Sequence, residues 1–334
     1  MSSYISYTCT ICNRSFDAPP TKTCDRISQC DIIEQYKNAQ ERRRSFPQFY
    51  CGLAGAREAG KTYFLLSLIS NLLNPKEPLE ALLDELELKF EFATNLSKHE
   101  FKKLSSNAAM AKLKGNTPPP DLTAEPFDLL IHKNIGSEKQ NFILTIFNSS
   151  GELYNSPGLN EIPKTPLRHE VKDAHVMLVF VDPIHDRGLS DLLNENHVAK
   201  FPYDINSIEI LYEILKKNSE KVSVPMAVCL SKFDLLHHRQ GISIHQPYIT
   251  LGDIQQVLLE EDVKLIDSTS LQLKELLRKY STTTKPKDID SKFNNTKYFA
   301  VAPIGHNEIN TAKKLEPKGI YAPFFWVLQQ LRII

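Results

Sequence analysis

A glycine-flanked loop at residues 55–62 constrains the fold of this chain more than any other feature. Its sequence, Gly-Ala-Arg-Glu-Ala-Gly-Lys-Thr, fits the pattern G-x-x-x-x-G-K-[ST]. The apolar run 48–54 precedes the loop, and residues 61–73 after it carry apolar side chains at helical spacing. A strand, a tight loop and a helix in this order direct backbone N–H groups at one anion, and the helix N-terminus adds partial positive charge. The pattern therefore predicts a phosphate-binding loop.

Two side chains of this loop have predicted roles of their own. Lys61 is expected to reach the β- and γ-phosphates of a nucleotide, and the Thr62 hydroxyl is expected to bind Mg²⁺, so both are candidate catalytic residues. The alternative is a chance match at an ordinary helix N-terminus. The predicted nucleotide-binding residues of the loop are Gly55, Ala56, Arg57, Glu58, Ala59, Gly60, Lys61, Thr62 and Tyr63.

Short apolar runs alternate with helical patterns from residue 47 onward. The expected strands are 48–54, 88–93, 127–132, 141–147, 175–182, 224–230 and 298–302. The expected helices are 61–73, 99–113, 207–217, 251–260, 271–279 and 323–331. Runs such as 176–181 show no alternation, which is typical of strands buried on both faces of a parallel sheet. We therefore expect a three-layer α/β sandwich with a mainly parallel sheet over residues 47–334.

The charge balance limits the classes of partner. The 40 basic and 40 acidic side chains cancel, so no global field attracts nucleic acid or an anionic membrane. No apolar run is long enough to predict a membrane span, and the N-terminus lacks the basic and apolar regions of a secretory signal. These features predict a cytoplasmic protein whose partners are not nucleic acids.

Four of the six cysteines lie close together near the N-terminus, at Cys9, Cys12, Cys24 and Cys30. Four thiolates suit tetrahedral Zn²⁺, and a segment this short needs more than apolar burial to fold. We expect a zinc module at residues 1–35 and a charged connector at 36–46, with loose thiols as the alternative. Cys51 and Cys229 lie in apolar runs and are expected to be small buried side chains.

Three further segments follow strand candidates, in a fixed order after the loop. Asn148-Ser-Ser-Gly151-Glu152 follows the run 141–147, Ser-Lys-Phe-Asp at 231–234 follows 224–230, and Pro-Ile-Gly at 303–305 follows 298–302. Together with the loop, these segments resemble the four motifs of P-loop GTPases of the translation-factor-related class. Their wide spacing is similar to that of bacterial double-GTPase families, which are associated with conflict and defence systems.

This resemblance implies roles for the second motif. In the class, the strand ends in Asp-x-x-Gly, and the aspartate holds Mg²⁺ through water. Asn148 would take that metal role, the Gly151 amide would bind the γ-phosphate, and Glu152 would be a catalytic residue near the attacking water. Asn148 departs from the pattern, because an amide in place of a carboxylate removes a full charge. The alternative for this segment is an ordinary turn.

The third motif implies recognition of the base. An aspartate at position 234 accepts two hydrogen bonds from guanine that an adenine edge cannot supply, and the stem of Lys232 packs over the base. Ser231 replaces the asparagine of the family pattern. The alternative is a solvated lysine beside a helix-capping aspartate.

These motifs together predict a guanine-nucleotide switch that slowly hydrolyses GTP to GDP and phosphate and signals to protein partners. One alternative is an ATP-using regulatory enzyme in which Asp182, at the end of the most apolar strand, holds the metal. Another is a nucleotide-binding scaffold with little hydrolysis, for which Asn148 is the clue. The switch threonine is expected at Thr117, with Thr123 or Ser105 as alternatives.

Overall fold

The structure is a computed structural model, and it describes most of the chain from residue 46 onward. The described residues are 7–8, 15–16, 46–56, 58–94, 97–99, 101–102, 104–106, 127–148, 171–193, 207–216, 221–237, 239, 242, 244, 246–259, 264–304 and 317–334.

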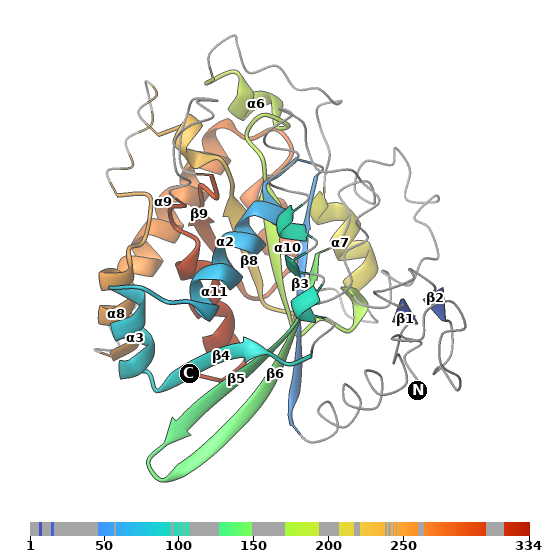
Figure 1. Ribbon diagram of the computed structural model, residues 1–334. Helices are drawn as coiled ribbons and strands as arrows, with labels where there is room; N and C mark the ends of the chain where they lie inside the picture. Colours follow the sequence, from blue (N-terminus) through green and yellow to red (C-terminus); the bar gives the residue numbers. More distant parts are fainter. Residues whose placement is uncertain are drawn as a thin grey trace.

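A seven-stranded mixed sheet forms the centre of the described part of the chain, in the order β4-β5-β6-β3-β7-β8-β9 (Figure 1). Strands β6, β3, β7, β8 and β9 run parallel, whereas β5 is antiparallel to both of its neighbours. The predicted α/β fold with a mainly parallel sheet is therefore confirmed. The strands are β3 (Gln48–Gly55), β4 (Leu88–Phe92), β5 (Phe127–Ile135), β6 (Glu138–Asn148), β7 (Val176–Val181), β8 (Met226–Leu230) and β9 (Thr296–Ala300).

Helices cover both faces of the sheet, and two hydrophobic clusters lie between the layers. On one face pack α2 (Lys61–Leu73), α3 (Leu79–Glu85), α8 (Leu251–Leu259) and α11 (Tyr321–Gln330). The other cluster includes residues of α6 (Arg187–Ser190), α7 (Ser207–Leu215), α9 (Lys264–Tyr280) and α10 (Pro286–Lys292). Because the central strands are covered twice, every residue of β7 and β8 is buried, which explains their unbroken apolar sequences.

Three elements, β5, β6 and α9, extend beyond their predicted bounds. Strands β5 and β6 form one long hairpin that reaches Ile135 and Glu138, although its outer residues are polar or exposed (Figure 1). Backbone pairing continues there without apolar burial, so no hydrophobic pattern marks it. Helix α9 begins at Lys264 rather than at residue 271, because Thr269 and Ser270 supply part of its buried face. Polar side chains on a buried face conceal helical periodicity.

The N-terminal cysteines lie outside the described residues, so the zinc module stays a prediction. The described part of that region is an antiparallel pair of two-residue strands, β1 (Tyr7–Thr8) and β2 (Ser15–Phe16), and in the sequence Cys9 and Cys12 fall between them. Cys51 and Cys229, by contrast, are buried in β3 and β8 as expected. Among the helices that the structure describes, none is long and apolar enough to cross a membrane.

The end of β3 depends on a glycine. Gly55 has φ 136°, and a Cβ placed on it would lie 2.4 Å from the carbonyl oxygen of Phe180 in β7.

We predict that Gly55→Ala lowers the free energy of unfolding by about 3 kcal/mol, from combined steric overlap and backbone strain. Urea unfolding measures this loss. Gly136→Ala is the matched control, because Gly136 also has positive φ but no neighbour within 4 Å of the added methyl. Equal losses in the two variants would contradict the proposed contact.

Candidate functional site

The predicted phosphate loop joins β3 to α2. Strand β3 ends at Gly55 and α2 begins at Lys61, as the sequence pattern predicted. Gly60 precedes the helix with φ 84°, and Glu58 also has a positive φ of 65°. These left-handed residues turn the chain sharply enough to place the N-terminus of α2 above the end of the sheet. Of the nine predicted loop residues, Arg57 lies outside the described residues.

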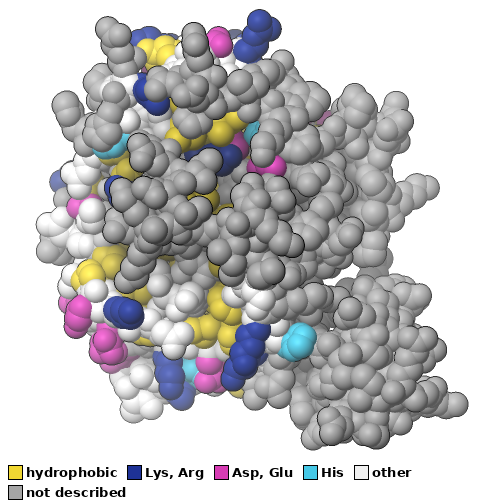
Figure 2. Space-filling model, turned by 45° about the horizontal axis from the view of Figure 1, so that its top comes forward, with side chains coloured by type: hydrophobic (Ala, Val, Ile, Leu, Met, Phe, Trp, Pro, Cys, Tyr) yellow, Lys and Arg dark blue, Asp and Glu magenta, His cyan; other side chains and the backbone are white. Residues whose placement is uncertain are grey.

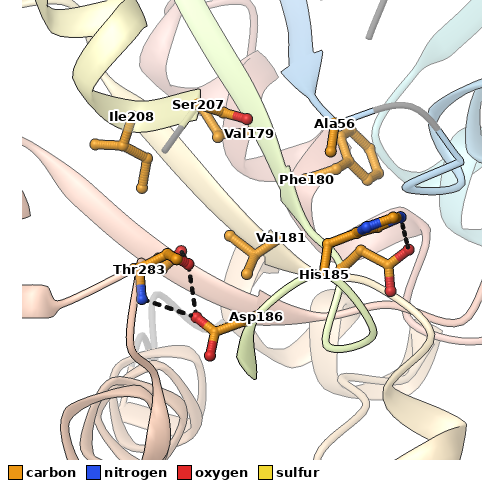
Figure 3. A pocket seen from close by; sticks show the side chains of 11 residues that line it. Ala56, Val179, Phe180, Val181, His185, Asp186, Ser207, Ile208 and Thr283 are labelled. Carbon is orange, nitrogen blue, oxygen red and sulfur yellow. Dashed lines mark hydrogen bonds and ion pairs between the residues drawn. The ribbon is translucent and has the colours of Figure 1, made fainter. Parts of the chain in front are cut away.

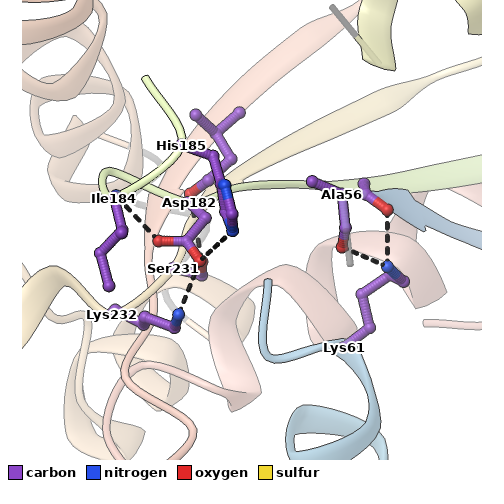
Figure 4. A network of polar contacts seen from close by, with 9 residues as sticks. Ala56, Lys61, Asp182, Ile184, His185, Ser231 and Lys232 are labelled. Atoms are coloured by element: carbon purple, nitrogen blue, oxygen red, sulfur yellow. Dashed lines mark hydrogen bonds and ion pairs between the residues drawn. The ribbon is translucent and has the colours of Figure 1, made fainter. Parts of the chain in front are cut away.

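Lys61 points into the loop that precedes it (Figure 4). The residue is 7% exposed, and its Nζ donates hydrogen bonds to the carbonyl oxygens of Gly55 at 2.6 Å and Ala56 at 2.8 Å. Burial lowers the pKa of Lys61 to about 7, although the negative charge of Asp182 opposes this shift. The loop therefore encloses an ammonium group whose present partners are neutral carbonyls, and a negatively charged ligand would stabilise its charge better.

Thr62 and Asn148 meet at the ends of two neighbouring elements. Asn148 is the last residue of β6, which pairs with β3 in parallel register, and its Nδ2 lies 3.4 Å from Thr62 Oγ1. The Asn148 Oδ1 is buried, and no described residue hydrogen-bonds to it. A buried oxygen acceptor beside a hydroxyl is a suitable pair of ligands for Mg²⁺ or its bound water. The structure thus brings together the two residues that the sequence predicted for the metal.

The end of β7 contributes a buried carboxylate (Figure 4). The Asp182 side chain is 0% exposed; its Oδ2 lies 2.6 Å from Lys232 Nζ and 3.9 Å from His185 Nε2. Its Oδ1 accepts a hydrogen bond from the backbone N–H of Ile184 at 3.0 Å. Burial lowers the pKa of His185, and the charges of Asp182 and Lys232 act on it in opposite directions. Lys232 is therefore the cation closest to Asp182 in this network.

The segment after β8 is held by backbone and side-chain contacts to both neighbouring strands. Ser231 is fully buried, and its Oγ donates to the carbonyl oxygen of Val181 at 3.1 Å. Lys232 has a positive φ of 49°, and the N–H of Phe233 donates to the carbonyl of Val301 at 3.2 Å. Asp234 lies partly exposed in the short helix η3 (Phe233–Leu235). The segment thus lies between the ends of β7 and β9.

The loop after β9 completes this edge of the sheet. Pro303 lies against the phosphate loop, since a Cβ on Gly60 would be 3.5 Å from its Cγ. Burial raises the pKa of the Tyr248 phenol, and the charge of Asp234 raises it further, which locates Tyr248 in the same area. Figure 2 looks onto this end of the molecule, where basic, acidic and histidine side chains lie close together. All four predicted motifs have at least one described residue here.

A second carboxylate fixes the loop that leaves β7. Asp186 is 1% exposed, accepts a bond from the N–H of Leu189, and also accepts bonds from Ser281, Thr282 and Thr283. Burial alone would raise the pKa of Asp186, but the bonds from the 281–283 loop outweigh it and hold the pKa below its ordinary value. Figure 3 shows this contact beside a small cavity that also reaches Ala56. Asp186 was not among the predicted site residues, although it lies only four positions after Asp182 in the sequence.

Only some of the remaining predicted residues belong to the described ranges. Ser105, an alternative to Thr117 as the switch residue, lies in the short helical stretch 104–106. Within the described ranges, no group of three or more His, Cys, Asp or Glu side chains is arranged to hold a metal ion. The predicted residues outside the described ranges are Arg57, Gly151, Glu152, Thr117, Thr123, Gly305 and the cysteines Cys9, Cys12, Cys24 and Cys30.

One protein-family model matches the chain. The model described as Double-GTPase 2 matches residues 50–272, which contain the loop at 55–62, Asn148, Asp182 and the segment 231–234. This range covers the larger part of the described sheet, from β3 to β8. No match was found among curated proteins.

Solved structures show a more distant likeness. The Saccharomyces cerevisiae Ski7 GTPase-like domain bound to GTP is 15% identical, with a TM-score of 0.36, and the match covers 87% of this chain and 52% of that one. Translation elongation factor SelB from Methanococcus maripaludis, in complex with the GTP analogue GppNHp, is 11% identical, with a TM-score of 0.29 and coverages of 86% and 34%. The match thus covers about half the length of the Ski7 GTPase-like domain chain and about a third of the SelB chain. At such TM-scores these proteins are points of similarity only.

The Asp186 network generates a prediction about stability and pH. We expect Asp186→Asn to lower the free energy of unfolding by about 3 kcal/mol at pH 7, because an amide cannot accept from all the donors that face the carboxylate. The folded-state pKa of Asp186 is depressed, so its stabilisation is present above about pH 4 and is lost as the pH falls toward the folded value. The variant and the wild type should therefore converge in acid.

Urea unfolding between pH 3 and pH 8 measures this convergence. Asp191→Asn is the matched control, because Asp191 is an exposed carboxylate at the end of the same helix α6. We expect it to change stability by less than about 0.5 kcal/mol. A loss at Asp186 that does not depend on pH would show that its charge contributes nothing.

Proposed function

The chain belongs to the Double-GTPase 2 family, and from this premise we propose that it binds GTP, hydrolyses it slowly to GDP and phosphate, and acts as a molecular switch. One observation supports the proposal most strongly. Three strand ends bring the lysine of the phosphate loop, the Thr62–Asn148 pair and the 231–234 segment to one edge of the sheet. A triphosphate, its metal ion and its base require these three kinds of contact in this arrangement.

Lys61 is the proposed phosphate ligand. Its ammonium is held by the carbonyls of Gly55 and Ala56, which are neutral acceptors inside the loop. Phosphate oxygens carry full charge and form stronger hydrogen bonds with an ammonium group, so a bound triphosphate would draw Lys61 away from these carbonyls. As the bond between the β- and γ-phosphates breaks, Lys61 and the backbone N–H groups of the loop stabilise the developing negative charge.

Thr62 and Asn148 are the proposed ligands of Mg²⁺. The buried Asn148 Oδ1, to which no described group donates, fits an oxygen-binding cation or its water, and the adjacent Thr62 hydroxyl supplies a second oxygen. When bound, Mg²⁺ would neutralise charge on the β- and γ-phosphates. Asn148 contributes no negative charge, so metal capture should depend more on the phosphates than on the protein.

Asp234 and Lys232 are the proposed base-recognition residues. The Asp234 carboxylate can accept both the ring N–H and the amino N–H of guanine, and adenine has no matching pair of donors. The aliphatic stem of Lys232 would pack over the base, while Ser231 fixes the segment through Val181. This arrangement favours GTP over ATP.

The remaining parts of the proposal follow from the resemblance to GTPases. Glu152 would orient the attacking water, the Gly151 amide would contact the γ-phosphate, and Thr117 would order on GTP binding. A switch of this kind acts through partner proteins, and we propose that the partner belongs to a defence system. We also propose that the N-terminal cysteines bind a structural zinc ion. Glu152, Gly151 and Thr117 lie outside the described part of the chain.

A second candidate function is a nucleotide-binding scaffold with little hydrolysis. Asn148 favours it, because a neutral amide at the metal position weakens the charge balance that supports phosphoryl transfer. The ATP-using alternative, with Asp182 on the metal, is not favoured. Both Asp182 oxygens already have partners, namely the Lys232 ammonium and the N–H of Ile184.

Titration of the purified chain with GTP and ATP in the presence of Mg²⁺ tests base selection. We expect GTP to bind more tightly, and Asp234→Ala to weaken GTP about 100-fold while leaving ATP unchanged, because two charge-assisted hydrogen bonds are lost. Lys61→Ala, in contrast, should weaken both nucleotides. Asp84→Ala, at an exposed site on α3, is the control. Equal affinities for GTP and ATP in the wild type would contradict guanine selection.

Single-turnover hydrolysis of GTP tests the role of Asn148. We expect Asn148→Asp to lower the Mg²⁺ concentration needed for half-maximal rate by about tenfold, because a carboxylate adds a full charge beside Thr62. A large gain in maximal rate would indicate that the native protein is closer to a scaffold than to an efficient enzyme. Asn134→Asp, on the exposed end of β5, is the control. An unchanged Mg²⁺ dependence would remove Asn148 from the metal site.

A further inference from the structure

The ion pair between Asp182 and Lys232 joins the ends of β7 and β8. Its Oδ2–Nζ distance is 2.6 Å, the Asp182 side chain is 0% exposed, and the Lys232 side chain is 25% exposed. The pair bridges 50 positions of sequence, and neither residue could be assigned to the other from spacing alone. The geometry therefore shows one fully buried end, at Asp182, and one end that is still accessible, at Lys232.

Asp182 is fixed more firmly than Lys232. Strand β7 ends one residue before it, its Oδ1 accepts the N–H of Ile184, and its backbone carbonyl accepts the N–H of His185 at 3.0 Å. A buried carboxylate needs a compensating positive charge, and Lys232 is the lysine that supplies one at direct contact. The buried Asp182 carboxylate thus determines where the Lys232 ammonium lies.

Lys232 also has a backbone that needs support. Its φ of 49° lies in the left-handed region, which is unfavourable for a residue with a side chain. The adjacent contacts from Ser231 to Val181 and from Phe233 to Val301 hold the backbone on either side. The ion pair holds the tip of the side chain. With both ends fixed, the aliphatic stem of Lys232 spans a defined path beside Asp234.

We propose that Asp182 is a positioning residue for base recognition, because it anchors the Lys232 ammonium so that the lysine stem is ordered before a purine base arrives. This inference rests on the proposed nucleotide-binding function. Ordering a free lysine side chain on binding costs conformational entropy, and the anchor removes that cost in advance. Asp182 contacts neither metal nor phosphate in this role; it acts through Lys232.

Comparison of GTP with inorganic tripolyphosphate isolates the contribution of the base and ribose. The ratio of the two dissociation constants, measured for one variant at one pH, cancels any effect that is confined to the phosphates, including the charge of Asp182 on Lys61. We define the ratio as the dissociation constant for tripolyphosphate divided by that for GTP. We expect this ratio to be above one in the wild type, because GTP binds more tightly, and Asp182→Asn to reduce it about tenfold. A loss of phosphate affinity alone would leave the ratio unchanged and would overturn the proposal.

Two further variants keep the test independent of folding. Asp182→Asn combined with Lys232→Met removes both charges, leaves no unpaired buried ion, and should show the same reduced ratio as Asp182→Asn alone. A ratio equal to that of the wild type in the double variant would overturn the proposal, even if the single variant were unstable. Asp186→Asn is the matched control, because this neighbouring buried carboxylate bonds to the 281–283 loop and should leave the ratio unchanged.

The outcome for the wild type separates this inference from the proposed function. If the wild type bound GTP no more tightly than tripolyphosphate, base recognition itself would fail, and this inference would fail with it. If the wild type discriminated strongly but Asp182→Asn kept the full ratio, the proposed function would stand and only the role of Asp182 would be lost.

Discussion

The close contact between β3 and β7 places the start of the phosphate loop beside the end of β7. Gly55, the last residue of β3, has no side chain, so its Cα can approach the carbonyl of Phe180 closely. The phosphate loop therefore starts beside Phe180, near the C-terminal end of β7, and Phe180 lies two residues before Asp182. This proximity is why the Asp182 charge acts on the pKa of Lys61, although the two residues are far apart in the sequence. A bulkier residue at position 55 would separate the loop from the strand that balances its charge.

The site is organised around the cost of burying charge. Lys61 and Asp182 are both nearly inaccessible to water, and each is retained only because polar groups compensate it. The carbonyls of Gly55 and Ala56 accept hydrogen bonds from Lys61, and Lys232 neutralises Asp182. The two lysines thus have different partners: one has neutral acceptors that a phosphate can replace, and the other has a fixed counter-ion. In the proposed function, this difference separates the lysine that binds phosphate from the lysine that contacts the base.

Much of the fold followed from local pattern. The strand and helix around the phosphate loop were predicted at residues 48–54 and 61–73, because tight turns and apolar periodicity leave a local signature. The outer hairpin of β5 and β6 and the start of α9 were missed, because backbone pairing without burial and polar residues on a buried face leave none. Ser231, Lys232 and Asp234 were predicted by resemblance, but the partner of Lys232 was not.

The sequence by itself determined where most of the strands lie, where a glycine-flanked loop joins β3 to α2, and the order of the four motifs, since these depend on neighbouring residues. Only the tertiary structure decided which side chains meet. The order of strands in the sheet placed Asn148 beside Thr62 and Asp182 beside Lys232. The packing of α9 against α6 placed the 281–283 loop beside Asp186. Such pairs lie at large sequence separations, and their contact depends on strand register and helix packing, which leave no trace in the spacing of the residues.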